Sequence, residues 1–438
     1  MQNRTDRGME HRAWDTDVFI VVLCALLSTL VFTAPDRSVA SEGDLKLREL
    51  IDEALQKSPE ILASQYRAEA SQYRIPQVKS LPDPMFMFGY QNEGWTRYNW
   101  GDTQMSWWMF SASQMVPFPG KLSLKGEMAS RESESLRAAY DSSRLKVIMK
   151  VKELYYDLFL GHRNLDLLKD RVVLFSRIED AATARYSSGM GPQQDVLMAQ
   201  TEKYMLLEKE EMQKQKIQSL EAMLNSTIGR EVNSPLGRPS DPLPNVFSRT
   251  MDELLSMAYE NSPEVRAREK MVRSSEARVR MAEKEYYPDF TFTGNVMKRR
   301  GEFDDMWSLT AAMNIPLYYR TKQRQAVNEA KASLSEARNE VEATKLMIAS
   351  NIRDNYAMVA SAQRLMELYR DGLIPKTSQD FESALAGYAA GKVDALTVIS
   401  RLRALLEFET LYWTQFSEKE KAAARLESMA GIMDSGGQ

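Results

Sequence analysis

The spacing of hydrophobic and polar residues changes along the chain, and the same series of spacings occurs twice. Each series begins with apolar residues at helical intervals, which predicts a short amphipathic helix. These residues are Leu47, Leu50, Ile51, Ala54 and Leu55 in the first series, and Met251, Leu254, Leu255, Ala258 and Tyr259 in the second. Ser-Pro-Glu follows at residues 58–60 and 262–264, where we expect serine to cap and proline to open another helix. These helices are predicted to end near Ser80 and Tyr286.

Prolines then mark a change to the two-residue period of β-strands. The predicted strands are residues 85–93, 104–116, 289–297 and 307–315. Strands of about nine to eleven residues have the length of tilted β-strands that cross a membrane. Aromatic residues in the two hairpins that these strands form are typical of a girdle at the membrane interface. They are Trp95, Trp100, Trp107, Trp108, Phe290, Phe292 and Trp307. The alternative is a soluble two-stranded arm that packs on a helix.

A long helix is predicted after each pair of strands. Residues 121–186 contain no proline, and a helix of this length extends about 95 Å. A turn at residues 189–192 and a return helix over 193–227 follow. The second half repeats this order from about Thr321, with a turn at Gly391 and a return helix over 394–430. Pro375, with Gly372 shortly before it, predicts a kink in the second long helix only.

The repetition indicates a duplicated domain. Tyr186 and Gly189 recur 202 residues later as Tyr388 and Gly391. Four prolines make the segment between the two copies an extended linker. The predicted division is a first repeat at 41–228, the linker at 229–249, a second repeat at 250–431 and a C-terminal tail at 432–438.

Residues 1–40 are predicted to be a secretory signal peptide. Arginines precede an apolar run at 18–34, and the small residues of Ser38-Val39-Ala40 favour cleavage after Ala40. An uncleaved membrane anchor is the alternative. The only cysteine, Cys24, lies within this segment, so we expect no disulfide or thiolate chemistry in the mature chain.

Composition and charge mainly exclude classes of function. A net charge of −4 gives no basic footprint for nucleic acid. His162 stands alone on a long charged helix, where we expect it to be solvated, and this disfavours a metal site or proton relay. The sequence contains no phosphate loop, nucleophile elbow or supported carboxylate pair. We therefore predict no enzyme activity, no catalytic residue, no cofactor and no bound metal.

Methionines recur every seven residues at Met198, Met205 and Met212. Successive side chains at this spacing lie about 10.5 Å apart along a helix, which is too far for two of them to share one ion. We therefore predict a packed seam here and not a series of metal ligands.

Four strands cannot close a barrel in a membrane, because an open sheet edge leaves backbone groups unpaired in lipid. The smallest membrane barrels have about eight strands, so we expect the chain to oligomerise. Two copies would supply eight strands, and side chains fill a barrel of that size, whereas three copies would supply twelve and leave a pore. A hairpin leaves and returns on one side of the membrane, so the long helices are expected to project together and form a tube.

This order of elements resembles the TolC-like outer-membrane efflux proteins over residues 45–431. The resemblance rests on the duplicated helix–hairpin–helix order, on Ser58-Pro59-Glu60 and on the repeated Tyr-x-x-Gly turns. Residues 113–122, 372–375 and 388–394 are similar to the branch that serves heavy-metal pumps. The resemblance implies a mainly α chain with a pair of membrane β-hairpins. It also implies a homotrimer in which a twelve-stranded β-barrel continues into a long α-helical barrel.

The resemblance also implies roles for the residues of the two turns. In the family these turns lie at the periplasmic tip, where an adaptor docks and polar contacts keep the entrance shut. The residues so implied are Tyr186, Gly189, Asp195, Tyr388, Gly391, Asp394 and Thr397. Asp195 matches the gate aspartate of the family, but its equivalent in the second repeat is Thr397, so that half departs from the usual acidic position. The helix dipole alone would also favour an aspartate at this place.

The resemblance implies that the chain functions as a passive exit duct. It also implies that the chain lies in outer-membrane lipid and extends into the periplasm. The implied partners are two further copies, a periplasmic adaptor protein and an inner-membrane pump of the RND type, with metal ions among the possible substrates. Two alternatives are a periplasmic adaptor and a structural coiled-coil protein of the cell envelope. An adaptor has one helical hairpin where this chain has two, and a coiled coil leaves the Trp-rich strands unexplained.

Overall fold

The computed structural model describes residues 44–241 and 248–433. The described helices and strands belong to one compact unit that begins at Asp44. The predicted signal peptide, with its cleavage site after Ala40, lies outside the described residues, as do parts of the predicted linker and tail. Within the described residues, none of the helices has the length and apolar character that crossing a bilayer requires.

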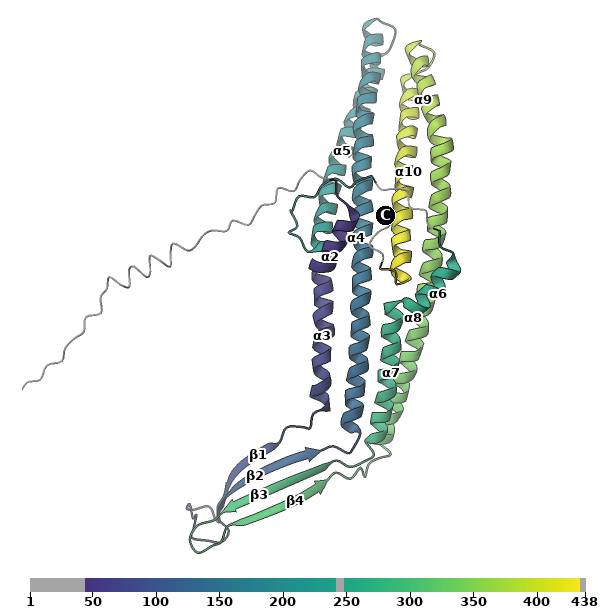
Figure 1. Cartoon of the computed structure of the whole chain (residues 1–438). Helices are drawn as coiled ribbons and strands as arrows, with labels where there is room; N and C mark the ends of the chain where they lie inside the picture. Colours follow the sequence, from purple (N-terminus) through teal and green to yellow (C-terminus); the bar gives the residue numbers. More distant parts are fainter. Residues whose placement is uncertain (1–43, 242–247, 434–438) are drawn as a thin grey trace, which may run out of the picture. The chain divides into compact units, whose positions relative to one another are not determined.

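The elements follow the predicted order in both halves of the chain (Figure 1). The first half contains α2 (Leu47–Lys57), α3 (Pro59–Lys79), β1 (Met85–Gln91), β2 (Trp107–Val116), α4 (Lys121–Ser187) and α5 (Gln193–Ile228). The second half contains α6 (Met251–Asn261), α7 (Pro263–Lys284), β3 (Phe290–Lys298), β4 (Met306–Met313), α8 (Gln323–Leu368), the π-helical segment η1 (Tyr369–Leu373), α9 (Ile374–Ala389) and α10 (Ala395–Met429).

The starts of α3 and α7 differ from the prediction in one respect. Ser58 and Ser262 occupy the N-cap positions and proline takes the first turn, but neither serine side chain makes a capping hydrogen bond. Both serines are buried, and their backbone N–H groups instead donate to carbonyl oxygens of the preceding short helix. A capping box does form before α6, where Thr250 and Glu253 satisfy each other's backbone N–H groups.

The four strands form one antiparallel sheet in the order β1-β2-β3-β4. The central pair joins the two halves of the chain, because β2 belongs to the first repeat and β3 to the second. The register is regular along all three pairs, so the side chains alternate strictly between two faces. In the described part of the chain, β1 and β4 form the edges of the sheet.

The two faces of the sheet differ in chemistry. Large apolar side chains dominate one face, and many of them are highly exposed, as with Phe86 at 80% and Trp307 at 78%. This apolar face carries Phe86, Phe88, Tyr90, Trp108, Phe110, Phe290, Phe292, Val296, Trp307, Leu309 and Met313. The opposite face carries serines, threonines, asparagine and methionines, and we call it the polar face. The predicted side-chain alternation in β3 and β4 is confirmed.

A buried polar contact links the sheet to the long helices. Lys121, the first residue of α4, is 2% exposed. Its Nζ donates to Asp289 Oδ1 at 2.9 Å and to the carbonyl oxygen of Tyr287 at 3.1 Å. The backbone N–H of Phe118 donates to the same Asp289 oxygen at 2.8 Å. Because Asp289 directly precedes β3, this contact ties the end of the first hairpin to the start of the second.

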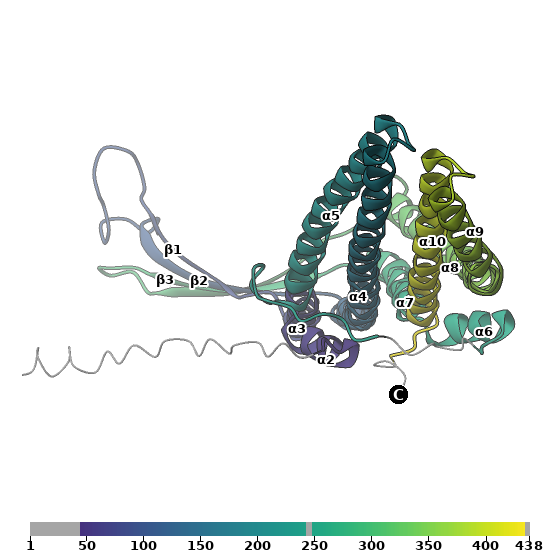
Figure 2. The same cartoon turned by 90° about the horizontal axis from the view of Figure 1, so that it is seen from above.

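Helix α4 packs against α2, α3, α5, α7 and α10, whereas α8 packs against α7 and α10. Val151, Leu158 and Leu224 belong to an apolar core that α2, α4 and α5 share. Ion pairs accompany the contact between α4 and α10, at 2.6 Å for Lys152–Glu427, 2.7 Å for Glu153–Arg425 and 2.8 Å for Asp157–Lys421. In the view of Figure 2, α5 lies beside α4 and α9 lies beside α10.

The second long helix is interrupted where Gly372 and Pro375 predict a break. The α-helical pattern changes to the π-helix η1 at Tyr369–Leu373 and resumes with α9, whose second residue is Pro375. Proline lacks the N–H that would bond one turn back, and a π segment is a common way to accommodate such a gap. The equivalent part of α4 runs without interruption to Ser187.

Two glycines at corresponding positions of the two halves allow close approach between backbones. Gly229 follows α5 at φ 88°, and an added Cβ would lie 2.4 Å from the carbonyl oxygen of Lys57. Gly431 follows α10 at φ 73°, and its Cβ would lie 2.7 Å from the carbonyl oxygen of Asn261. Each contact brings a return helix against the residue that precedes Ser-Pro-Glu, so the duplication extends to the close approach of backbones.

We expect Gly229→Ala and Gly431→Ala each to lower the free energy of unfolding by about 2 kcal/mol or more, because left-handed strain and a backbone clash add. The matched control is Gly189→Ala, where φ is also 73° but nothing lies within 4 Å of the new Cβ. The free energy of unfolding of that variant should fall by only about 1 kcal/mol, because only the left-handed strain acts there. Thermal unfolding midpoints of the purified proteins measure the difference, and equal losses in all three variants would contradict the clash.

Candidate functional site

The candidate site is formed by the turns that end the two long helical hairpins. The α4–α5 turn and the α9–α10 turn have the same backbone, with Gly189 and Gly391 both at φ 73°. In each turn the glycine N–H donates to the carbonyl oxygen of the tyrosine three residues earlier, at 3.0 Å. Only glycine adopts this conformation without strain, which explains the repeated Tyr-x-x-Gly pattern.

The two tyrosines of these turns have different environments. Tyr186 is 47% exposed, whereas Tyr388 is 1% exposed and belongs to an apolar cluster with Phe381, Ala199 and Val398. The duplicated sequence therefore produces one surface tyrosine and one core tyrosine. The buried one joins the hairpins, because its cluster draws on α4, α5, α9 and α10.

A hydrogen bond from Tyr388 to Asp195 connects the two hairpins. The tyrosine hydroxyl donates to Asp195 Oδ2 at 3.2 Å. Asp195 lies in the first turn of α5, and Tyr388 lies near the end of α9. Burial and the neighbouring carboxylate both disfavour a tyrosinate, and they raise the pKa of Tyr388 to about 12. The hydroxyl therefore stays protonated and able to donate throughout the physiological pH range.

Arg185 is a further member of this contact that the sequence analysis did not identify. Its guanidinium carbon lies 4.6 Å from the centre of the Tyr388 ring, and its Nη1 donates to the carbonyl oxygen of Tyr388. Its Nη2 donates to the carbonyl oxygen of Met190 at 3.2 Å. One arginine of α4 thus holds its own turn and the opposite hairpin together. We call Arg185, Asp195 and Tyr388 the tip latch.

A comparison of the two repeats offers one signal for Arg185. Its equivalent in the second half is Gly387, so the first turn has a large cationic side chain at a position where the second turn has none. A further ion pair connects the two hairpins, between Arg403 of α10 and Glu202 of α5. Neither residue stands out in the sequence, since isolated charges on a helix are usually solvated.

Asp394 and Thr397 have a local role in the structure. Asp394 is the N-cap of α10, and its Oδ1 accepts from the backbone N–H of Thr397 at 2.8 Å. Hydrogen bonds from Thr397 lower the pKa of Asp394. Among the described residues, no hydrogen bond connects either of them with the tip latch. The structure therefore brings Asp195 together with Tyr388, and it leaves these two residues on their own helix.

The aromatic residues predicted for the membrane girdle occupy three different places. Trp108, Phe290, Phe292 and Trp307 lie on the apolar face of the sheet. Trp107 pairs with Gln91 and points to the polar face, because neighbouring residues on a strand alternate. Trp95 and Trp100 belong to the loop that joins β1 and β2. Trp95 is fully exposed, and Trp100 lies 5.3 Å from the guanidinium carbon of Arg300.

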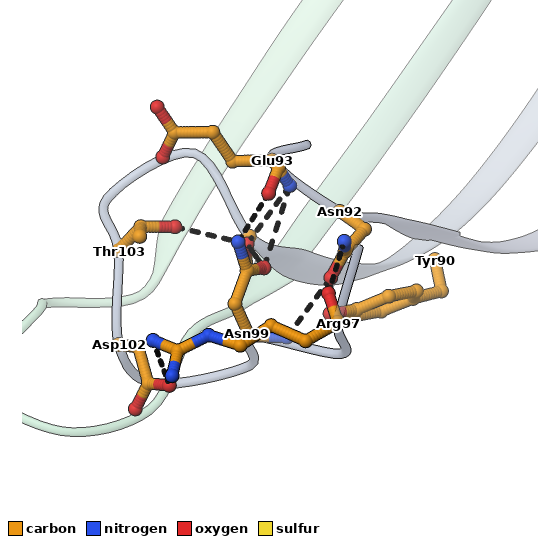
Figure 3. Close-up of polar contacts among 8 residues, drawn as sticks. Tyr90, Asn92, Glu93, Arg97, Asn99, Asp102 and Thr103 are labelled. Atoms are coloured by element: carbon orange, nitrogen blue, oxygen red, sulfur yellow. Dashed lines mark hydrogen bonds and ion pairs between the residues drawn. The ribbon is translucent and has the colours of Figure 1, made fainter. Parts of the chain in front are cut away.

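The β1–β2 loop is organised by side-chain amides (Figure 3). The Asn92 Nδ2 donates to the carbonyl oxygen of Arg97 at 2.9 Å, and the Asn92 Oδ1 accepts from the Tyr90 hydroxyl at 2.7 Å. Asn99 is 6% exposed and donates to the carbonyl oxygen of Glu93. These bonds satisfy loop backbone groups that no strand pairs, so the loop is an ordered structure.

The prediction that His162 is solvated is wrong, and the prediction of a packed methionine seam is correct for one of its three residues only. His162 is half-buried, and its Nε2 has no hydrogen-bond partner in the described part of the chain. Burial disfavours the charged imidazolium and lowers the pKa of His162. Met198 packs against the apolar cluster that contains Tyr388. By contrast, Met205 and Met212 are 43% and 65% exposed. Both of these exposed methionines line a groove of about 950 Å³ that α4, α5 and α10 form. Helical periodicity located these methionines correctly but could not show which face of α5 the other helices leave uncovered.

The described residues contain no cluster of three or more histidine, cysteine, aspartate or glutamate side chains that could hold a metal ion. The site at the tips is therefore a set of polar and cation–π contacts between two hairpins. Such contacts can hold two helical hairpins together or release them.

Comparisons with known proteins agree with this architecture. The chain is 23% identical over 342 residues to the cobalt-zinc-cadmium resistance protein CzcC of Cupriavidus metallidurans, which covers 75% of this chain and 79% of that protein. The outer membrane protein VceC of Vibrio cholerae has a TM-score of 0.74 at 17% identity, covering 88% of this chain and 96% of VceC. The structure of CusC also has a TM-score of 0.74, at 12% identity, covering 88% of this chain and 91% of CusC.

These structural similarities establish the fold, in which a small antiparallel sheet connects to long helical hairpins. A family model described as outer membrane efflux protein matches residues 50–230 and 254–431. The two matched segments correspond to the two halves of the duplication and span most of the described chain. The chain therefore belongs to the outer membrane efflux protein family.

Proposed function

We propose that this chain is one of three identical subunits of an outer-membrane channel, which serves as the passive exit duct of a tripartite efflux system. The observation that carries the proposal is the four-stranded sheet, which has an exposed apolar face and two open edges and connects to long helical hairpins. A sheet of this kind is stable in lipid only when its edges find partners. Three copies would supply the strands for a closed barrel with a pore.

The two faces of the sheet suit the two surfaces of such a barrel. The apolar face, with Phe88 and Leu309, matches a lipid-facing surface, and the polar face, with Asn295 and Thr293, matches a water-filled lumen. Trp108 and Trp307 lie near the loop ends of their strands, and Phe290 and Phe292 lie near the helix ends. These two levels correspond to the two aromatic girdles of membrane barrels. Trp107 belongs to the lumen in this arrangement.

The helical tips form the periplasmic entrance in this proposal. The tip latch holds the α9–α10 hairpin against the α4–α5 hairpin and so favours a closed tip. The exposed turns at Gly189 and Gly391 are the docking surface for a periplasmic adaptor protein. Release of the latch upon docking would let the hairpins move apart, and η1 in the second long helix supplies the place where that helix can bend.

The proposed cargo is a metal ion. CzcC is named for resistance to cobalt, zinc and cadmium, and this chain is similar to it over three quarters of its length. An inner-membrane pump of the RND type would select the ion, and the duct itself would catalyse no reaction. A signal peptide cleaved near Ala40 would direct the chain to the outer membrane.

Detergent extraction and a planar-bilayer recording test the proposal as a whole. We expect the protein to be extracted from outer membranes as a trimer and to form ion-conducting pores after reconstitution. A periplasmic adaptor or a structural coiled coil would be recovered without detergent and would not conduct. A water-soluble monomer would contradict the proposal.

Asp195→Ala should raise the open probability of the reconstituted channel. The substitution removes a hydrogen bond to a charged group, worth about 1.5 kcal/mol, so we expect about a tenfold shift towards the open state. Asp380→Ala is the matched control, because Asp380 pairs with Arg401 within the α9–α10 hairpin and not between hairpins. Single-channel recording measures both variants. An open probability of Asp195→Ala equal to that of the wild type would contradict the role of the latch.

The latch should also weaken at alkaline pH. The pKa of Tyr388 is raised from 10.0 to about 12, so the folded protein binds this proton more tightly than the unfolded chain does. The stabilisation is therefore complete below pH 10 and is lost as the pH rises to about 12. Thermal midpoints of wild type and Tyr388→Phe should keep a constant difference up to about pH 10. Above that pH the wild type should lose stability relative to the variant, and a constant difference up to pH 12 would contradict this coupling.

A further inference from the structure

Methionines are placed in a regular way on the polar face of the sheet. The register aligns residues of neighbouring strands in rows that cross the sheet. The row nearest the loops, among those that involve all four strands, consists of Gly89, Met109, Met297 and Met306. Met109 is directly opposite Met297, and Met297 is directly opposite Met306. Three consecutive strands therefore present a thioether at the same level and on the same face.

The geometry of an antiparallel sheet brings these three side chains within reach of one another. Directly opposite residues have Cβ atoms about 5 Å apart. A methionine side chain has three rotatable bonds, so its sulfur can move by more than this separation. All three methionines are half-buried. By contrast, Met85 and Met87 on the same face are 71% and 55% exposed and stand opposite serines.

Gly89 leaves room at the fourth position of the row. The Met109 Cε lies 3.8 Å from the place that a Cβ of Gly89 would occupy. Met109 therefore extends over the glycine, on the polar face, as the register requires. The neighbouring row towards the helices contains Asn295 and Ser308, joined by a hydrogen bond of 3.1 Å. The methionine row thus lies beside a neutral polar row, with no carboxylate in either row to attract a hard cation.

We propose that Met109, Met297 and Met306 form a binding site for a soft monovalent cation, Cu(I) or Ag(I), with three thioether ligands. Thioethers select soft ions such as Cu(I), while the harder divalent ions need imidazole, carboxylate or water. The site is neutral before binding, so a monovalent ion brings less charge into it than a divalent ion would. The contrast with Met198, Met205 and Met212 is geometric, because helical repeats separate side chains that a strand register brings together.

The position of the row assigns it a role that rests on the proposed channel function. If the polar face lines the lumen, the row lies near the end of the duct that the β-hairpin loops surround, and each subunit contributes one such site. An ion that leaves the helical part of the duct would first meet the rows that contain serine and threonine, then the methionine row, and after it the Gln91–Trp107 pair at the loop end. A three-thioether site without an anionic ligand holds its ion weakly enough to let it leave, as conduction requires.

Silver titration of the purified trimer in detergent, in a chloride-free nitrate buffer, tests the site. We expect Met297→Leu to weaken Ag(I) binding at least tenfold, because the central ligand is lost while side-chain volume is conserved. The triple variant Met109→Leu, Met297→Leu, Met306→Leu should lose one bound Ag(I) per subunit. X-ray absorption at the silver edge should show sulfur neighbours in the wild type, and fewer of them in the triple variant.

Two matched variants control for the other methionines of the chain. Met313→Leu changes the apolar face, and Met87→Leu changes a methionine of the polar face that stands opposite Ser111. Both should bind Ag(I) as the wild type does. Unchanged binding in Met297→Leu, or an equal loss in both controls, would overturn the site.

Pore conductance of the same preparations separates this inference from the proposed function. The leucine variants should still form trimers and conduct, which also shows that they fold. Conducting variants whose silver binding is unchanged would refute the methionine site and leave the channel intact. If the wild type binds silver at the methionine row but forms no pore, the proposed channel function is refuted and the proposed binding site stands.

Discussion

The two open edges of the four-stranded sheet are the constraint on which the rest of the structure depends. The backbone N–H and C=O groups along the outer edges of β1 and β4 need hydrogen-bond partners. The exposed apolar face of the sheet favours lipid as its surroundings, and lipid offers these groups no partner. Joining copies edge to edge satisfies both demands. The contact among Lys121, Asp289 and Phe118 then fixes how the hairpins meet the helices, so the sheet and the helical part are held in one arrangement.

Duplication supplies this architecture, and divergence between the copies supplies the latch. The two turns share a backbone, the same glycine conformation and a tyrosine, yet Tyr186 is a surface residue and Tyr388 is buried between hairpins. Arg185 has no counterpart in the second half, where Gly387 takes its place. An interface between two identical hairpins would place like groups against each other. Differences at a few positions instead allow a cation, a ring and a carboxylate to converge.

The molecule separates its functions along its length. The sheet presents one face suited to lipid and another suited to a polar lumen, and the ordered β1–β2 loop closes the first hairpin at its far end. The helices carry apolar clusters and ion pairs between α4 and its neighbours. The polar contacts that could open lie at the tips. The proposed duct would need this division, because its barrel must exclude lipid while its entrance opens and closes.

The sequence alone determined the order of elements, the duplication, both turns and the strand alternation, because these depend on local spacing, proline and glycine. It also indicated Asp195 and Tyr388 separately. It did not predict their hydrogen bond, the burial of His162, the exposure of Met205 or the participation of Arg185, because these depend on which helix faces are covered. The strand register decided that Trp107 lies on the polar face, away from the aromatic side chains of the apolar face. It also decided that three methionines share a row. Such neighbours are distant in sequence, and only the pairing of strands and hairpins brings them together.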